Sequence, residues 1–223
     1  MNIQKNIQEI QEDIKKYSPY PEKVTLVAVT KYVNSDIIKE VLKTGVNTLG
    51  ENKVQVIESK RKDFPENNYN IKWHFIGNLQ KNKVKYIASY IDMIHSINKL
   101  SLAKEIDKRS KDLNRKIEVL LEINISGEES KEGYLLEDLI KDIPELLKLE
   151  NIKICGLMTM APFDEEENII RRYFSKLREL KDSWNELYFN NQLTELSMGM
   201  SQDYKIALEE GATLIRVGSN IYK

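Results

Sequence analysis

Cysteine is almost absent from this sequence, since Cys155 is the only one among 223 residues. A single cysteine excludes an intrachain disulfide and fits a reducing, cytoplasmic location. Histidine is nearly as scarce: His74 and His95, without clustered cysteines, leave little material for a zinc site, so we expect no metal. The nine glycines and five prolines are too few and too dispersed to indicate a linker or a disordered arm.

The chain also lacks an excess of one charge. Charged residues make up 31% of it, yet the formal net charge is only -1, which argues against nucleic-acid binding through a general positive field. No apolar run approaches the length of a membrane span, and the segment Met1–Lys5 has no apolar signal core. We therefore expect a protein of the cytoplasm with no nucleic-acid or membrane partner.

The sequence is instead rich in alternating strand and helix patterns. Predicted strands lie at residues 24–31, 46–52, 71–77, 91–96, 116–124, 152–160, 195–199 and 212–218. Helical patterns separate them, at about residues 34–45, 53–62, 81–89, 98–113, 133–149, with Pro144 marking a kink or break, 166–188 and 201–210. Eight such units with short connections predict an α/β protein with a (β/α)8 TIM barrel fold, in one domain spanning residues 1–223. Isoleucines at helical spacing over residues 2–17 predict an additional N-terminal helix.

The first predicted strand ends abruptly in a lysine, Lys31. In a barrel of this class, residues at the carboxyl ends of the strands face the site where ligands bind. Lys31 is therefore a candidate amine at the mouth of the barrel. A solvated lysine that merely closes a strand is the alternative, and position alone does not separate the two.

The other strand ends carry few strong acids or bases. Asn52 ends the second predicted strand and His74 lies near the end of the third, but a histidine at such a position is more often structural than functional. The set lacks the paired carboxylates of a glycosidase, and it lacks a Ser/His/Asp arrangement with an evident oxyanion hole.

The last two strand ends are more informative. Met198–Asp203 and Arg216–Asn220 run from the ends of the seventh and eighth predicted strands into the loops that follow. These barrels usually bind phosphate there. Glycines let the backbone approach an anion, and serine hydroxyls and helix-start N–H groups bind it, although such glycines also serve ordinary turns. A phosphate here, with Arg216 and Lys31, suggests pyridoxal 5'-phosphate (PLP). Its aldehyde would form a Schiff base with Lys31, its phosphate would lie on Ser201 and on Gly218–Ser219, and Arg216 would face the pyridine nitrogen.

Several longer motifs resemble one known family. They are Thr30–Lys31, Gly50–Asn52, Trp73–Lys83, Gly156–Met160, Ser197–Asp203 and Arg216–Gly218. They are similar to those of the pyridoxal phosphate homeostasis proteins, the bacterial YggS-like family, whose fold is related to the barrel domain of alanine racemase. The resemblance covers essentially the whole chain, and the long tryptophan–histidine motif is highly specific.

The resemblance implies a cytosolic barrel protein that carries PLP on Lys31 and buffers the cofactor or delivers it to apo PLP-dependent enzymes. The implied cofactor-binding residues are Lys31, Asn52, His74, Met200, Ser201, Arg216, Gly218 and Ser219. Lys131 matches a further basic position of the family and is implied to lie near the cofactor. The end of the chain, residues 220–223, departs from the family's usual Ile-Phe-Gly tail.

The residues also bear on whether the protein is an enzyme. A permanently cationic arginine disfavours protonation of the pyridine nitrogen and hence strong carbanion stabilisation. Racemisation needs a second positioned acid or base, which in alanine racemase is a tyrosine from an additional β-domain that this sequence does not contain. We expect a non-catalytic, monomeric PLP-binding protein. The alternatives are a weak PLP-dependent amino-acid racemase and a phosphate-sugar barrel enzyme in which Lys31 captures another aldehyde.

Overall fold

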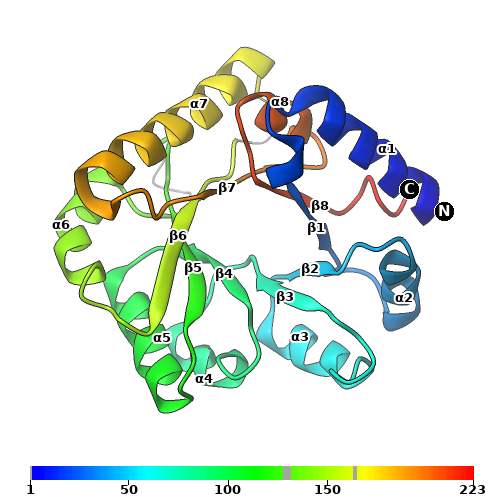
Figure 1. Ribbon diagram of the computed structural model, residues 1–223, viewed down its shortest axis with the longest axis horizontal. Coiled ribbons are helices and arrows are strands. Elements are labelled where there is room, and N and C mark those ends of the chain that lie inside the picture. Colours follow the sequence, from blue (N-terminus) through cyan, green and yellow to red (C-terminus); the bar gives the residue numbers. More distant parts are fainter. Residues whose placement is uncertain (1, 128–131, 163–164) are drawn as a thin grey trace.

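The computed structural model describes residues 2–127, 132–162 and 165–223, and its centre is a closed barrel of eight parallel strands (Figure 1). Each strand pairs with its neighbours in sequence, and β8 closes the ring against β1. The strands are β1 (Thr25–Val29), β2 (Thr48–Glu51), β3 (Lys72–Phe75), β4 (Met93–Ile97), β5 (Ile117–Glu122), β6 (Ile152–Met158), β7 (Glu195–Met200) and β8 (Leu214–Val217). The expected (β/α)8 barrel is confirmed.

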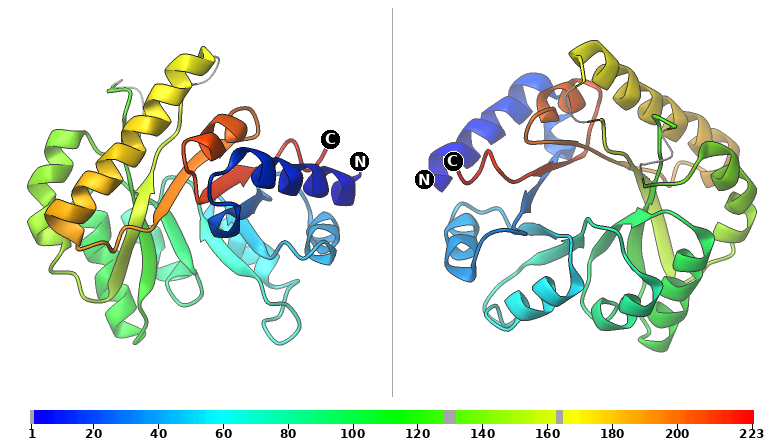
Figure 2. Two further views of the ribbon diagram at one scale, coloured as in Figure 1. Left: turned by 45° about the horizontal axis from the view of Figure 1, so that its top comes forward. Right: turned by 180° about the vertical axis from the view of Figure 1, so that it is seen from behind.

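Helices surround the barrel and cover its outer face (Figures 1 and 2). They are α1 (Ile3–Tyr17), α2 (Ser35–Lys43), α3 (Val54–Arg61), α4 (Val84–Ile87), α5 (Leu100–Asp112), α6 (Leu136–Leu146), α7 (Glu167–Trp184) and α8 (Tyr204–Glu209). Pro144 lies in the last turn of α6, which continues only to Leu146. The helix expected at 81–89 consists of a 3-10 turn, η2 (Lys81–Lys83), followed by the short α4.

The additional N-terminal helix is also confirmed. The four isoleucines of α1 are buried, and α1 contacts α8 and α2. The Asn6 side-chain amide donates to the carbonyl oxygens of Ile221 and Lys223. These two bonds tie the ends of the chain together, and Figure 2 shows the N and C termini side by side.

The interior of the barrel changes character along its axis. Its apolar part contains Val27, Met93, Leu120, Cys155, Met158 and Leu214. Because side chains alternate across a strand, residues two positions further along share the same face. Three of these positions carry His95, Glu122 and Arg216, all buried. On β4, β5 and β8 the interior is therefore apolar nearer the amino ends, and a buried polar layer of His95, Glu122 and Arg216 follows toward the carboxyl ends.

No helix in the described part of the chain is both long enough and apolar enough to cross a membrane.

Candidate functional site

Lys31 lies directly after β1, in a turn closed by a hydrogen bond from the Val33 N–H to the Thr30 carbonyl. Its side chain is half-buried, and its Nζ lies 5.0 Å from the ring centroid of Tyr32, which is 88% exposed. Among the described residues, no carboxylate forms an ion pair with this amine. The structure thus places the Lys31 side chain, without an ion pair among the described residues, where the first strand leaves the barrel.

The loops after β7 and β8 are joined to each other. The Gly218 N–H donates to Ser201 Oγ over 3.1 Å, and the Asn220 side-chain amide donates to the Ser201 carbonyl over 2.7 Å. The Met200 N–H donates to Asp203 Oδ1 over 2.5 Å, which fixes the turn into α8. Since Ser201 Oγ accepts from Gly218, its own O–H remains able to donate to an anion. Ser219 follows in the same loop.

A glycine at position 218 permits a close approach to β1. A Cβ there would lie 3.3 Å from the Cβ of Val29, tighter than most such contacts. The rim formed by the loops after β7 and β8 is thereby held against the strand that leads to Lys31.

Arg216 is completely buried and hydrogen-bonds only to neutral acceptors within the described chain. One Nη donates to Ser197 Oγ over 2.5 Å, and the other donates to the Thr159 carbonyl over 3.0 Å. Burial lowers the pKa of Arg216 to about 10, while the negative charges of Asp203 and Glu122 act in the opposite direction. The side chain is therefore a buried cation at neutral pH.

The strand register relates this cation to the lysine. Val27 of β1 pairs with Arg216 of β8, so Lys31 lies four residues beyond that pair. At a rise of about 3.3 Å per residue, this corresponds to roughly 13 Å along the strand. Lys31 therefore lies closer to the mouth of the barrel than the buried Arg216 does.

A chain of hydrogen bonds connects Arg216 to His74. Ser197 Oγ is 2.8 Å from His95 Nδ1, and His95 Nε2 is 2.9 Å from His74 Nδ1. Burial lowers the pKa of His74 to about 3 and that of His95 well below its usual range, with Arg216 adding to the latter effect. Both rings are neutral, so each can donate at one nitrogen and accept at the other. His74 and Arg216 thus lie at opposite ends of this series of hydrogen bonds.

Glu122 contributes a buried carboxyl group to the same layer. Its residue is 2% exposed, and its Oε2 has no hydrogen-bond partner within the described part of the chain. Burial, followed by the negative charge of Glu132, raises the pKa of Glu122 to about 7, while the positive charge of Arg216 lowers it. This group therefore exchanges its proton near neutral pH beside the buried arginine.

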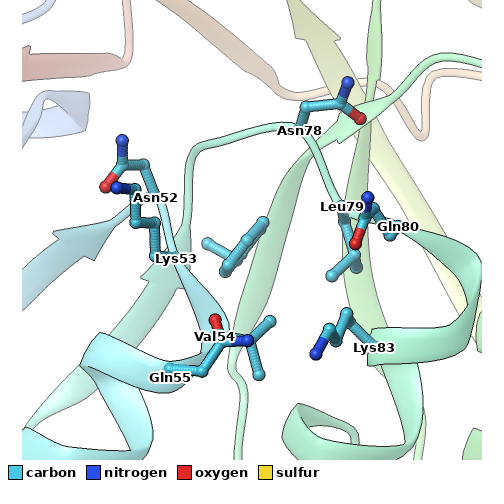
Figure 3. A pocket seen from close by; sticks show the side chains of 9 residues that line it. Asn52, Lys53, Val54, Gln55, Asn78, Leu79, Gln80 and Lys83 are labelled. Atoms are coloured by element: carbon cyan, nitrogen blue, oxygen red, sulfur yellow. The ribbon is translucent and has the colours of Figure 1, made fainter.

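Asn52 lies in a hollow at the ends of β2 and β3 (Figure 3). The cavity has a volume of about 250 Å³. Its polar lining consists of Asn52, Lys53, Gln55, Asn78, Gln80 and Lys83. The side chain of Asn52 thus lines a neighbouring part of the rim, apart from the hydrogen bonds that join Ser201 and Gly218.

The structure brings together Met200, Ser201 and Gly218, and it connects His74 with Arg216. Sequence reasoning missed the partners of these residues, which are His95, Glu122, Thr159, Ser197, Asp203 and Asn220. The sequence did indicate that His95 and Glu122 face the barrel interior, since each lies two positions after an apolar residue of a predicted strand and so shares its face. Lys131 lies outside the described residues.

These features define a parallel eight-stranded barrel with a lysine after its first strand and, after its last two strands, loops joined through Ser201, Gly218 and Asn220. A family model described as "alanine racemase, N-terminal domain" matches residues 1–223. The pyridoxal phosphate homeostasis protein of Aquifex aeolicus (strain VF5) is 42% identical over 197 residues, covering 88% of this chain and 85% of that protein. That of Synechocystis sp. (strain ATCC 27184 / PCC 6803 / Kazusa) is 37% identical over 202 residues, covering 91% and 92%. This chain belongs to the pyridoxal phosphate homeostasis protein family, as its motifs indicate.

Solved structures agree with this assignment. PipY of Synechococcus elongatus PCC7942, described with PLP bound, superposes with a TM-score of 0.90 at 30% identity, covering 99% of this chain and all of that chain (100%). The alanine racemase of Clostridium difficile 630 has a TM-score of 0.75 at 18% identity, covering 99% of this chain and 56% of that chain. The latter likeness confirms the alanine racemase barrel fold and no more.

Proposed function

We propose that this protein binds PLP and takes part in intracellular PLP homeostasis, holding the cofactor covalently on Lys31. The observation that supports the proposal is that a lysine after β1, a buried arginine on β8 and a serine–glycine rim lie on adjoining strands of one barrel. The names of the curated relatives and the PLP-bound PipY structure support it.

The residues present fit this cofactor. The Ser201 hydroxyl and the Ser219 backbone N–H offer neutral donors to a phosphate group, and the Gly218 N–H holds the Ser201 hydroxyl oxygen in place. The buried guanidinium of Arg216 suits an aromatic nitrogen that remains an acceptor. Asn52, His74 and Met200 complete the proposed set, Asn52 from the neighbouring hollow and His74 through His95.

When bound, the cofactor supplies an aldehyde that takes up the Lys31 amine in a reversible covalent bond. The chain's own residues then bind and orient. Ser201 and Gly218 hold the anionic end, and the contacts of Arg216 to Ser197 and Thr159 fix its guanidinium plane. Lys31 must move from Tyr32 toward the barrel, which its flexible stem permits.

We further propose that the protein carries the cofactor without robust catalysis. Arg216 stays cationic even at its lowered pKa of about 10, so it disfavours a second positive charge on the pyridine nitrogen. A weak amino-acid racemase is the alternative. In the proposed role the protein acts as a single-domain monomer in the cytoplasm and passes PLP to apo PLP-dependent enzymes.

The test is to mix the apo-protein with PLP, reduce with borohydride and map the labelled peptide. We expect one added cofactor mass on Lys31, lost in Lys31→Ala and retained in Lys53→Ala, which removes a neighbouring rim lysine. Label on another lysine, or none, would refute the proposal.

A second measurement separates carrier from racemase. The loaded protein is incubated with L-alanine and other amino acids, and the D-isomers are measured by chiral chromatography. We expect no production above that of free PLP. Sustained turnover that disappears in Lys31→Ala would establish the racemase instead.

A further inference from the structure

A buried ion pair lies behind the turn that carries Lys31. Glu51 ends β2 and is fully buried, and its Oε1 accepts from the Lys60 ammonium of α3 over 2.6 Å. The same oxygen accepts from the Thr30 hydroxyl over 2.6 Å. The Lys60 ammonium also donates to the Thr30 carbonyl over 2.6 Å. Thr30, which directly follows β1, thus forms one closed cluster with Glu51 of β2 and Lys60 of α3.

This cluster acts on the peptide group that joins Thr30 to Lys31. The Thr30 carbonyl accepts from both the Lys60 ammonium and the Val33 N–H, and the Thr30 N–H donates to the Gly50 carbonyl. Because a peptide group is planar, fixing its carbonyl oxygen fixes the plane from which the next Cα extends. The contacts of Thr30 therefore set the direction in which the Lys31 stem begins.

Stability alone is a poor explanation for the cluster. Ions are costly to bury, and well-packed apolar residues of similar volume often replace such a pair without loss of stability. In addition, Glu51 Oε2 has no hydrogen-bond partner among the residues described, which adds a further cost. The ion pair instead provides strong, directional bonds at the one carbonyl that precedes the reactive lysine.

We propose that Glu51 and Lys60, acting through Thr30, are positioning residues for the Lys31 amine. The inference rests on the proposed function, because it requires that Lys31 bonds to a carbonyl ligand. The cluster holds the backbone before Lys31 rigid, so that only the side chain rotates between Tyr32 and the barrel. Rigid placement raises the rate of bond formation because the amine searches fewer orientations.

The test is a variant in which the whole cluster is apolar, Thr30→Val/Glu51→Leu/Lys60→Met. Removing all three polar groups leaves no buried charge unpaired, so we expect a folded protein with a melting temperature near that of the wild type. The control variant, Glu118→Gln/Lys153→Met, removes the exposed ion pair near the start of β5 and β6. For each protein, stopped-flow absorbance gives the rate of covalent PLP attachment as a function of pH, and borohydride mapping identifies the site.

We expect attachment in the triple variant to be about ten- to a hundredfold slower, still at Lys31, and the control to match the wild type. If the triple variant does not fold, Thr30→Val alone removes only the bond to Glu51, and we expect it to slow attachment several-fold. Unchanged rates and pH profiles in whichever folded variant is measured would overturn the inference. Absence of label on Lys31 in the wild type would instead refute the proposed function.

Discussion

Replacing Glu122 with glutamine should stabilise the apo-protein, and the gain should grow with pH. The carboxyl group is buried beside Arg216 with one oxygen unpartnered within the described chain, and its pKa is raised from 4.5 to about 7, chiefly by burial. A raised pKa means that the folded protein binds this proton more tightly than the unfolded chain does. Its contribution to stability is therefore most favourable below pH 4.5, declines as the pH rises to about 7, and stays constant above that.

The size of the effect follows from the shift. Each pKa unit corresponds to about 1.4 kcal/mol, so the raised pKa of Glu122 lowers the unfolding free energy by about 3 kcal/mol at pH 8 and by about 1 kcal/mol at pH 5. Glutamine has nearly the same shape and carries no charge at either pH. The variant should therefore exceed the wild type in unfolding free energy by about 2 kcal/mol more at pH 8 than at pH 5.

The assay is calorimetric melting of both apo-proteins at pH 5 and pH 8. For a chain of this size, 1 kcal/mol corresponds to about 2–4 °C, so we expect the variant to melt about 6–12 °C higher at pH 8. Glu118→Gln, which removes a half-exposed carboxyl from the same strand, is the control and should show little pH dependence. A difference in melting temperature that is equal at the two pH values, or larger at pH 5, would refute the reasoning.

Three further predictions concern His74, Arg216 and Gly156. His74→Asn should flatten the acid limb of stability between pH 6.5 and about 3, since the folded pKa of His74 is depressed to about 3; an unchanged acid titration by circular dichroism would contradict this. Arg216→Glu should alter the absorption spectrum of bound PLP or its pH dependence, and an identical spectrum and titration would remove Arg216 as the ring-nitrogen partner. Gly156→Ala should destabilise the protein by about 3 kcal/mol in urea unfolding, because its Cβ would lie 2.0 Å from the Glu195 carbonyl; a loss within error of zero would show that β6 and β7 can separate there.

The barrel could be predicted because its strands are continuous apolar runs and its helices are periodic. Lys31, Ser201 and Gly218 could be placed at one end of it because parallel strands bring their carboxyl ends to one rim. Helix ends were predicted less accurately. At residues 81–89 the expected helix consists of a 3-10 turn and one short helix, since the polar residues that begin the segment provide no side-chain cap.

The polar layer inside the barrel could not be predicted in the same way. The position of His95 and Glu122 two residues after an apolar strand residue indicates burial, but not that His95 hydrogen-bonds to Ser197 of a strand distant in sequence or that Arg216 lowers the pKa of Glu122. Lys60 illustrates the same limit. It lies on a helix of mixed polarity, where a lysine is ordinarily solvated, yet it is buried because Glu51 and Thr30 lie beneath it.

The two polar clusters differ in how their charges are paired, and this difference supports the proposed carrier role. Behind Lys31, the pair Glu51–Lys60 is closed, so its charges cancel and its bonds fix geometry. Beside Arg216, the hydrogen-bond partners are neutral, so the positive charge is not cancelled by a direct ion pair within the described chain. An uncancelled buried cation opposes a proton on an aromatic nitrogen but attracts an anionic ligand. If Arg216 faces the pyridine nitrogen as proposed, this arrangement would weaken PLP as an electron sink and favour its retention, in agreement with the proposed carrier role.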